Sequence, residues 1–225
     1  MHFGNTIKAD VFDALATLVK ALGNGRRLEL VELLAQGEHS VDDLARMSGM
    51  ALTTTSAHLR TLKAAGLVRT RRERTTIHYR LAGDDVAKLF VTAKRVGLTR
   101  SPKLRETLHQ YLTDADGSTV GLSGVPTIDA AAVTTDMTVV DVRPAQEYAD
   151  GHFPGALSIP LADLTERTGQ IPPDRPVVLY CRGELCRLAR QAAHQLRQHG
   201  FDARAMDEGV LEWRANGTVD LDGAA

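Results

Sequence analysis

Cys181 and Cys186 are the two cysteines of this 225-residue chain, and one short loop is expected to contain both. Cys181 follows an apolar run at 176–180 that is typical of a buried parallel strand, and Gly183 favours a turn from that strand into a helix. The backbone N–H groups of such a turn, together with the positive end of the helix, stabilise a thiolate, a persulfide or a bound oxyanion. We therefore predict that Cys181 is a nucleophile with a low pKa.

The other residues of this loop leave its chemistry open. Cys186 could attack a persulfide on Cys181 and form an intramolecular disulfide, or it could pack under the helix as a small apolar residue. Arg182 and Arg187 would add positive charge to the loop. Cys181 and Arg187 also have the C-x5-R spacing of cysteine phosphatases and some arsenate reductases, although Tyr180, and no histidine, precedes the cysteine. Phosphate or arsenate chemistry is therefore an alternative to sulfur chemistry.

Charge is distributed unevenly along the chain. Residues 1–100 contain 16 basic and 10 acidic residues, whereas residues 101–225 contain 11 basic and 18 acidic residues. A basic half followed by an acidic half indicates two domains with different partners, and the basic half is the candidate for nucleic acid.

The first half has the periodicity of several helices and one hairpin. Amphipathic helices are predicted at 7–22, 26–35, 53–65 and 86–96, with a short helix that Ser40 caps and that ends near 47. Alternating residues at 67–71 and 76–81 predict a β-hairpin with a basic tip at 72–75. This order is that of a winged helix-turn-helix domain.

Two groups of side chains in this half are suited to DNA. A recognition helix needs short polar residues at its front to approach base edges, and a basic hairpin suits phosphate contacts. The alternative is that the arginines form an ordinary solvated face. The predicted contacts are Thr53, Thr54, Thr55, Ser56, His58 and Arg60 on the helix and Arg71, Arg72 and Arg74 on the hairpin.

The segment 7–96 resembles the arsenic-repressor (ArsR/SmtB) family at 22–28, 56–62 and 65–68. The resemblance implies a homodimer on double-stranded operator DNA, with pairing through the helices at 7–22 and 86–96, unless those helices cover only their own core. It also suggests metal sensing, but 40–45 contains no cysteine where the family's arsenic ligands lie, and 86–96 contains no histidine for the zinc site. We predict no metal site in this half.

The second half alternates strands at 138–142, 176–180 and 201–206 with helices that end near 198 and 215, which indicates a parallel α/β sheet. The segment 127–217 resembles a rhodanese (sulfurtransferase) domain at 141–143, 147–148, 151–156, 180–183 and 207–213. The resemblance supports Cys181 as the reactive residue. Asp141, Arg143, Glu147 and His152 are expected to hold the fold through ion pairs and hydrogen bonds, and Trp213 to pack in the core.

Together these observations predict two domains, a mainly α winged helix-turn-helix at 1–97 and an α/β rhodanese-like domain at 125–225, joined by a linker at 98–124 that is most flexible at 114–118. The predicted function is a repressor whose reactive cysteine senses sulfane sulfur or another thiol-reactive species. A thiosulfate-type sulfurtransferase tethered to a DNA-binding module is the alternative. Without a signal peptide or an apolar membrane span, the chain is expected in the cytoplasm, with no cofactor.

Overall fold

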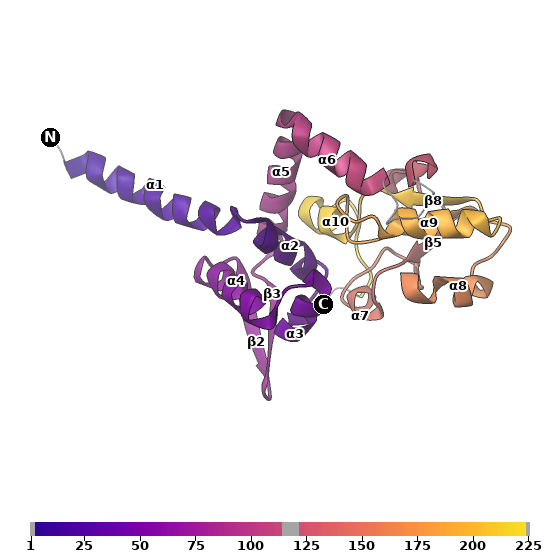
Figure 1. The fold of residues 1–225 in the computed structure, drawn as a ribbon, viewed down its shortest axis with the longest axis horizontal. Helices are drawn as coiled ribbons and strands as arrows, with labels where there is room; N and C mark the ends of the chain where they lie inside the picture. The colour runs from indigo at the N-terminus through magenta and orange to yellow at the C-terminus, as the bar shows by residue number, and fades with distance from the viewer. Residues whose placement is uncertain (1–2, 114–121, 224–225) are drawn as a thin grey trace. The chain divides into compact units, whose positions relative to one another are not determined.

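The computed structural model describes residues 3–113 and 122–223 (Figure 1). The chain forms two compact units, and the division between them falls after Phe90. The predicted boundaries at 97 and 124 remain predictions, and the flexible part of the predicted linker, 114–118, lies outside the described residues.

The first unit contains the predicted series of helices followed by a hairpin. Its elements are α1 (Phe3–Leu22), α2 (Gly25–Leu34), β1 (His39–Ser40), α3 (Val41–Ser48), α4 (Leu52–Ala64), β2 (Val68–Glu73), β3 (Thr76–Leu81) and the first turns of α5 (Asp84–Arg100). The Ser40 side chain caps α3 by accepting a hydrogen bond from the Asp43 N–H at 3.1 Å, and Gly49 ends that helix with a φ of 64°. This is the predicted winged helix-turn-helix arrangement.

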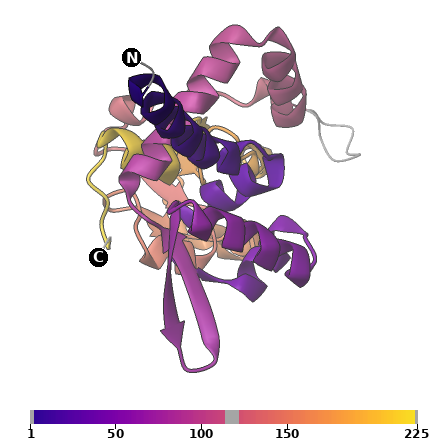
Figure 2. The same ribbon diagram turned by 90° about the vertical axis from the view of Figure 1, so that its left-hand side faces the viewer.

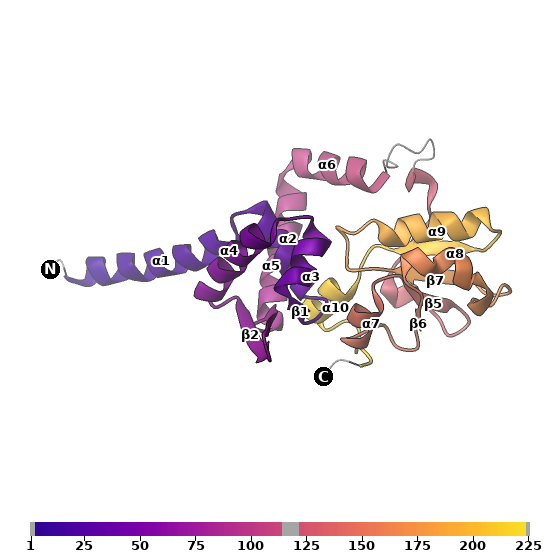
Figure 3. The same ribbon diagram turned by 60° about the horizontal axis from the view of Figure 1, so that its bottom comes forward.

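The core of the first unit lies between α2, α3, α4 and α5, where the fully buried side chains include Leu30, Val31, Leu44, Leu59 and Leu62. By contrast, α1 extends beyond the other helices of its unit (Figures 1 and 3). One of its faces presents large apolar side chains that are each more than half exposed, namely Ile7, Val11, Phe12, Leu15 and Val19. The sequence pattern of an amphipathic helix is therefore present, but this apolar face is not covered within its unit.

The hairpin projects from the helices of the first unit (Figure 2). Its antiparallel register pairs Arg72 with Ile77 and Glu73 with Thr76, so the strands continue further than predicted. The turn consists of Arg74 and Thr75, and Arg74 adopts a positive φ of 54°. The basic tip is thus shorter than the expected four residues, because Arg72 and Glu73 belong to a strand.

The second unit begins with the C-terminal turns of α5 and α6 (Pro102–Thr113) and contains a five-stranded parallel sheet in the order β4-β8-β7-β5-β6. The strands are β4 (Thr127–Ile128), β5 (Thr138–Asp141), β6 (Leu157–Ser158), β7 (Val177–Tyr180) and β8 (Ala203–Met206). The helices are α7 (Ala145–Ala149), α8 (Leu164–Arg167), α9 (Leu188–Gln198) and α10 (Val210–Asn216), with 3-10 turns at Leu122–Gly124, Ala130–Ala132, Leu161–Asp163 and Thr168–Gln170. The predicted parallel α/β sheet is confirmed.

Helices cover both faces of this sheet. Because side chains alternate along a strand, Val177 and Leu179 of β7 pack in the cluster that contains α8 and α9. Val178 and Tyr180 pack on the opposite face, against Trp213 of α10. Trp213 is fully buried, as predicted. None of the described helices has the length and hydropathy that a membrane crossing requires.

Candidate functional site

Cys181 lies where the sequence places it, directly after β7 at the carboxyl end of the sheet. Its side chain continues the alternation of β7 and points into the same cluster as Val177 and Leu179, beside Ala189 of α9. Only 1% of its surface is exposed. The residue that was predicted to be reactive is therefore also a core residue in this conformation.

The loop between β7 and α9 surrounds both sulfur atoms with backbone donors. The N–H groups of Gly183 and Ala189 interact with Cys181, and those of Arg182 and Leu188 interact with Cys186. Gly183 makes this loop possible through its φ of 157°, a conformation that other residues rarely adopt. The predicted nest of N–H groups is thus present around both cysteines.

The two cysteines are in direct contact. The Cys181 thiol donates a hydrogen bond to the backbone carbonyl oxygen of Cys186, with 3.2 Å between sulfur and oxygen. Burial raises the pKa of Cys181 well above its ordinary value, and a hydrogen bond from the Cys181 side chain lowers the pKa of Cys186 from 9.0 to about 7. The prediction that Cys181 has the lower pKa is therefore wrong for this structure, because Cys181 is buried and acts as the donor of the pair. The interpretation of Cys186 as a resolving thiol stays a prediction, supported by this contact.

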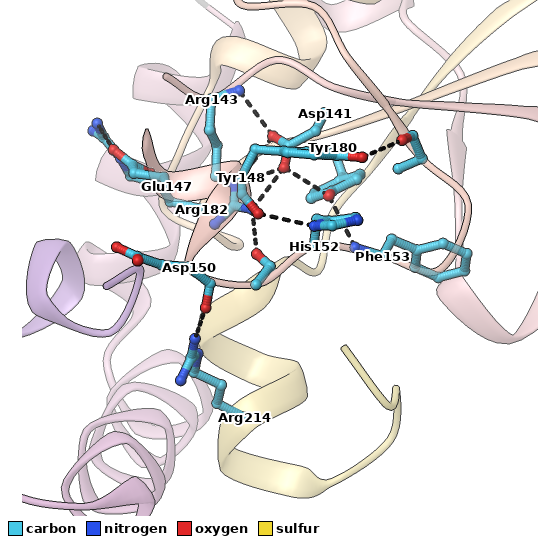
Figure 4. A network of polar contacts seen from close by, with 12 residues as sticks. Asp141, Arg143, Glu147, Tyr148, Asp150, His152, Phe153, Tyr180, Arg182 and Arg214 are labelled. Carbon is cyan, nitrogen blue, oxygen red and sulfur yellow. Dashed lines mark hydrogen bonds and ion pairs between the residues drawn. The ribbon is translucent and has the colours of Figure 1, made fainter. Parts of the chain in front are cut away.

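The arginines of the loop do not point their guanidinium groups at a common anion site. Arg182 forms an ion pair with the buried Glu147, with 2.6 Å between Nη2 and Oε1, and its Nε lies 3.1 Å from both carboxylate oxygens (Figure 4). The Arg187 guanidinium lies over the ring of Tyr111, 5.1 Å from its centroid. The expected positive field at the loop is thus partly balanced, since Arg182 is paired with a carboxylate.

A buried polar network supports the strand end next to Cys181 (Figure 4). Arg143 and Asp141 are both fully buried and form an ion pair with 2.6 Å between Nη2 and Oδ2. The Tyr180 hydroxyl donates to Asp141 at 2.7 Å and accepts from the Phe153 N–H at 3.0 Å. His152 stacks on Tyr148, with 3.7 Å between ring centroids. The predicted structural role of Asp141, Arg143, Glu147 and His152 is confirmed by these contacts.

Three charged residues beside the loop were not predicted. Lys94, on α5 and within the second unit, lies 2.7 Å from the Glu184 carboxylate and 2.5 Å from that of Glu212, measured from Nζ. Glu184 lies between the two cysteines in sequence, and Glu212 is on α10. Each of these residues resembles an ordinary surface charge in the sequence, so no local pattern indicates the cluster.

The predicted DNA-contacting residues of α4 are mostly on its accessible side. Thr53, Thr54 and Arg60 are exposed, and Ser56 and His58 are half-buried. Thr55 is an exception, because its side chain is fully buried and its hydroxyl donates to the Ala51 carbonyl at 3.1 Å. Thr55 lies four and seven positions before the buried Leu59 and Leu62, a helical spacing that places it on the inward face. We therefore assign Thr55 to the core and not to base contact.

The hairpin arginines are exposed, but they are not equivalent. Arg71 forms ion pairs with Glu38 at 2.6 Å and with Glu73 at 2.8 Å. Arg72 donates to the backbone carbonyl of Arg74 at 3.1 Å, which leaves its guanidinium near the tip. The tip of the hairpin thus presents Arg72 and Arg74, whereas the charge of Arg71 is shared with two carboxylates.

The residues that the structure describes contain no group of three or more histidine, cysteine, aspartate or glutamate side chains that could hold a metal ion.

Two family models match the chain. The "Bacterial regulatory protein, arsR family" model matches residues 24–70, and the "Rhodanese-like domain" model matches residues 128–216. These ranges fall on the helices of the first unit and on the sheet of the second unit.

Relatives of known description agree with both parts. The chain is 41% identical over 224 residues to the HTH-type transcriptional regulator Rv0324 of Mycobacterium tuberculosis (strain ATCC 25618 / H37Rv), covering 96% of this chain and 94% of the relative. It is 36% identical over 88 residues to a sulfurtransferase of Allochromatium vinosum, which covers 38% of this chain and 79% of that protein. Among solved structures, a homodimeric winged helix-turn-helix DNA-binding domain from Mycobacterium bovis is 49% identical, with a TM-score of 0.40, and the match covers 43% of this chain and 89% of that one.

The similarity to the Mycobacterium tuberculosis regulator extends over nearly the whole length of both chains and includes both units. The chain therefore belongs to the family of HTH-type transcriptional regulators that combine an ArsR-type winged helix-turn-helix with a rhodanese-like domain.

Proposed function

We propose that this regulator is a homodimeric repressor that binds operator DNA and senses sulfane sulfur through Cys181 and Cys186. The observation on which the proposal depends is the contact between the two cysteines, in which the Cys181 thiol donates to the Cys186 carbonyl at 3.2 Å. Two thiols held together in one loop can pass between a dithiol and a disulfide, and such a pair gives the loop two stable states.

The DNA-binding part of the proposal uses α4 and the hairpin. Thr53 and Thr54 lie at the N-terminal end of α4, where side chains of a recognition helix reach base edges, and His58 lies further along the same helix. Arg72 and Arg74 at the hairpin tip suit the phosphate backbone, which supplies affinity without sequence information.

Dimerisation is supported by the apolar face of α1. Its large side chains, Ile7, Val11, Phe12, Leu15 and Val19, are 53–67% exposed. A continuous apolar stripe of this kind marks an interaction surface, and pairing with the same helix of a second copy would bury it. Two copies of the first unit then present two recognition helices to two half-sites of an operator.

The proposed sulfur chemistry begins at Cys186. Its thiolate attacks the sulfane sulfur of a donor R–S–SH, which forms a Cys186 persulfide and releases the thiolate of R–SH. Cys181 then loses its proton and attacks the Cys186 sulfur atom, which forms the Cys181–Cys186 disulfide and releases HS⁻. Two thiols are oxidised and one sulfane sulfur is reduced to sulfide, so the donor is the oxidant.

A tethered sulfurtransferase is the second candidate, and the rhodanese-like match at 128–216 favours it. In that case Cys181 or Cys186 passes its persulfide sulfur to an external acceptor in repeated cycles, and DNA affinity is independent of the loop. An arsenate or phosphate enzyme is less consistent with this structure, because the Arg187 guanidinium lies over Tyr111.

Operator binding by full-length protein tests the proposal. An operator is selected from random-sequence DNA by the reduced protein, and its affinity is then measured before and after treatment with inorganic polysulfide, with intact-mass analysis of the same samples. We expect the wild type to lose the mass of two hydrogens and to change its DNA affinity about 5- to 150-fold, the usual range of allosteric coupling. Cys181→Ser and Cys186→Ser should keep one affinity in both conditions. Equal affinity of oxidised and reduced wild type would reject sensing and favour the tethered enzyme.

A further inference from the structure

Lys94 lies outside the loop, and its side chain contacts Glu184, a residue between the two cysteines. Its Nζ lies 2.7 Å from Glu184 and 2.5 Å from Glu212, and only 6% of its side chain is exposed. Glu212 is equally buried, whereas Glu184 is 38% exposed. An ammonium group that bridges two carboxylates in this way fixes the positions of both.

Glu212 in turn lies beside the loop, in the first turn of α10. Its second carboxylate oxygen accepts a hydrogen bond from the Gly209 N–H at 3.0 Å. The same carboxylate occupies the space beside Gly183, so that a side chain at position 183 would meet Glu212 Oε2 at 2.5 Å. The Lys94 ammonium is thus connected to the loop twice, directly through Glu184 and through Glu212 at Gly183.

The charges of this cluster are costly to bury and therefore depend on one another. Burial opposes the charge of Lys94, but Glu212 and Glu184 outweigh that effect and the pKa of Lys94 is raised. Burial also raises the pKa of Glu212, against the opposing effect of Lys94. Lys94 thus remains charged, whereas burial makes the charged form of the Glu212 carboxylate less favourable. Removal of one member of such a buried cluster leaves the others without compensation.

We propose that Lys94 is a positioning residue that holds the Cys181–Cys186 loop in its dithiol conformation, and that disulfide formation displaces Glu184 from Lys94. The proposal rests on the two-thiol chemistry proposed above. In the dithiol state the Cys181 sulfur is directed at the Cys186 carbonyl, and a disulfide requires bonding geometry between the two sulfur atoms instead. In this proposal the change shifts the residues between the two cysteines, and Glu184 is one of them.

This arrangement makes α5 the element on which the state of the loop acts. Lys94 lies on α5, which is one continuous helix from Asp84 to Arg100. The Lys94–Glu184 contact thus connects the loop to α5 without the segment at 114–118 of the predicted linker.

Four variants of the full-length protein test the positioning role. Lys94→Met removes the charge and keeps most of the length, Lys94→Arg keeps the charge, and Glu184→Gln removes one partner with little change of shape. Lys103→Met, at an exposed lysine of α6, is the matched control.

The first measurement is the rate at which iodoacetamide alkylates Cys181 in the reduced protein, read from peptide masses after cleavage at Arg182. We expect about a tenfold faster reaction in Lys94→Met and Glu184→Gln, because a looser loop exposes Cys181 more often, and wild-type rates in Lys94→Arg and Lys103→Met.

The second measurement is the reduction potential of the cysteine pair in glutathione buffers. Loss of Lys94 destabilises the dithiol conformation, so the equilibrium should shift about tenfold toward the disulfide, which is about 30 mV for a two-electron couple.

Wild-type alkylation rates in both Lys94→Met and Glu184→Gln would overturn the positioning role. If Lys94→Met does not fold, the alkylation rate of Glu184→Gln decides whether Lys94 positions the loop, because the Glu184 side chain is partly exposed. If the wild type forms no disulfide at all, the proposed two-thiol function fails, and the alkylation rates still decide the role of Lys94.

Discussion

The contact between the two cysteines predicts which thiol ionises first. Burial raises the pKa of Cys181, and the interaction with the Cys181 side chain is the main cause that lowers the pKa of Cys186 to about 7, so Cys186 becomes the thiolate. Replacement of Cys181 by alanine removes the side chain that lowers the pKa of Cys186. The pKa of Cys186 should therefore rise toward an ordinary value in Cys181→Ala, whereas the folded structure loses only one sulfur atom from its core.

The size of the effect on reactivity follows from the pKa. At pH 7, a thiol with a pKa of about 7 is roughly half ionised, against about 1% for a thiol with a pKa near 9. Nucleophilicity falls as the pKa falls, with a Brønsted coefficient of about 0.4–0.5, and this reduces the advantage by roughly six- to tenfold. Cys186 should thus react about five- to eightfold faster at pH 7 in wild type than in Cys181→Ala.

The assay is the rate of iodoacetamide alkylation of Cys186 between pH 5 and pH 10, resolved from Cys181 by peptide mass. The wild-type profile should rise with a midpoint near 7. In Cys181→Ala the midpoint should move upward, since the side chain that is the main cause of the lowered pKa is absent. A wild-type midpoint that belongs to Cys181, or a Cys186 midpoint that is the same in both proteins, would refute the assignment.

Three further predictions concern DNA binding and stability. Arg72→Ala and Arg74→Ala should each weaken DNA binding about equally across sequences and lower the salt slope by about 1, measured by fluorescence anisotropy, with Arg167→Ala of α8 as a control that leaves both unchanged. Thr54→Ala and His58→Ala should lose about 1–3 kcal/mol of discrimination between operator and scrambled DNA per base contact, whereas Thr55→Ala should lower the melting temperature instead, and equal losses for all three would contradict this division. Glu147→Ala should destabilise the protein by about 3–5 kcal/mol in urea unfolding, because it removes a fully buried carboxylate that forms an ion pair with Arg182, and a loss no larger than that of the exposed Glu166→Ala would contradict the role of this pair.

The parts of the fold that were predictable are those with enough residues to show a period. The helices α2, α3 and α4 and the strands β5, β7 and β8 each have an apolar pattern that matches their burial, whereas the apolar face of α1 is exposed. The strands β4 and β6 have two residues each and α8 has four, which is too few for a period to appear. Arg72 and Glu73 were assigned to a turn because of their composition, but pairing with β3 extends β2 through both. Tertiary pairing outweighs local preference at such edges.

The candidate site was predictable in its position but not in its electrostatics. A cysteine after an apolar strand, followed by glycine, is visible in the sequence, and the structure has Cys181 at that place. The direction of its side chain depends on the alternation of β7 and on where α9 begins. That helix begins at Leu188 and not directly after the glycine, so the cysteine pair is enclosed by a loop. Burial of Cys181 follows, and with it the reversal of the two pKa values.

The charges around the loop also differ from what the sequence suggests. The sequence places two arginines, Arg182 and Arg187, in the loop, but Arg182 is paired with Glu147. The charge of Arg182 is the last of the causes that lower the pKa of Cys186. The stronger causes are the Cys181 hydrogen bond and the N–H groups of Leu188 and Arg182, which are dipoles fixed by the fold. A carboxylate at Glu184 would oppose a thiolate so close in the chain, and its ion pair with Lys94 offsets that charge. The low pKa of Cys186 is therefore a property of loop geometry, and in our proposal Lys94 holds that geometry in place.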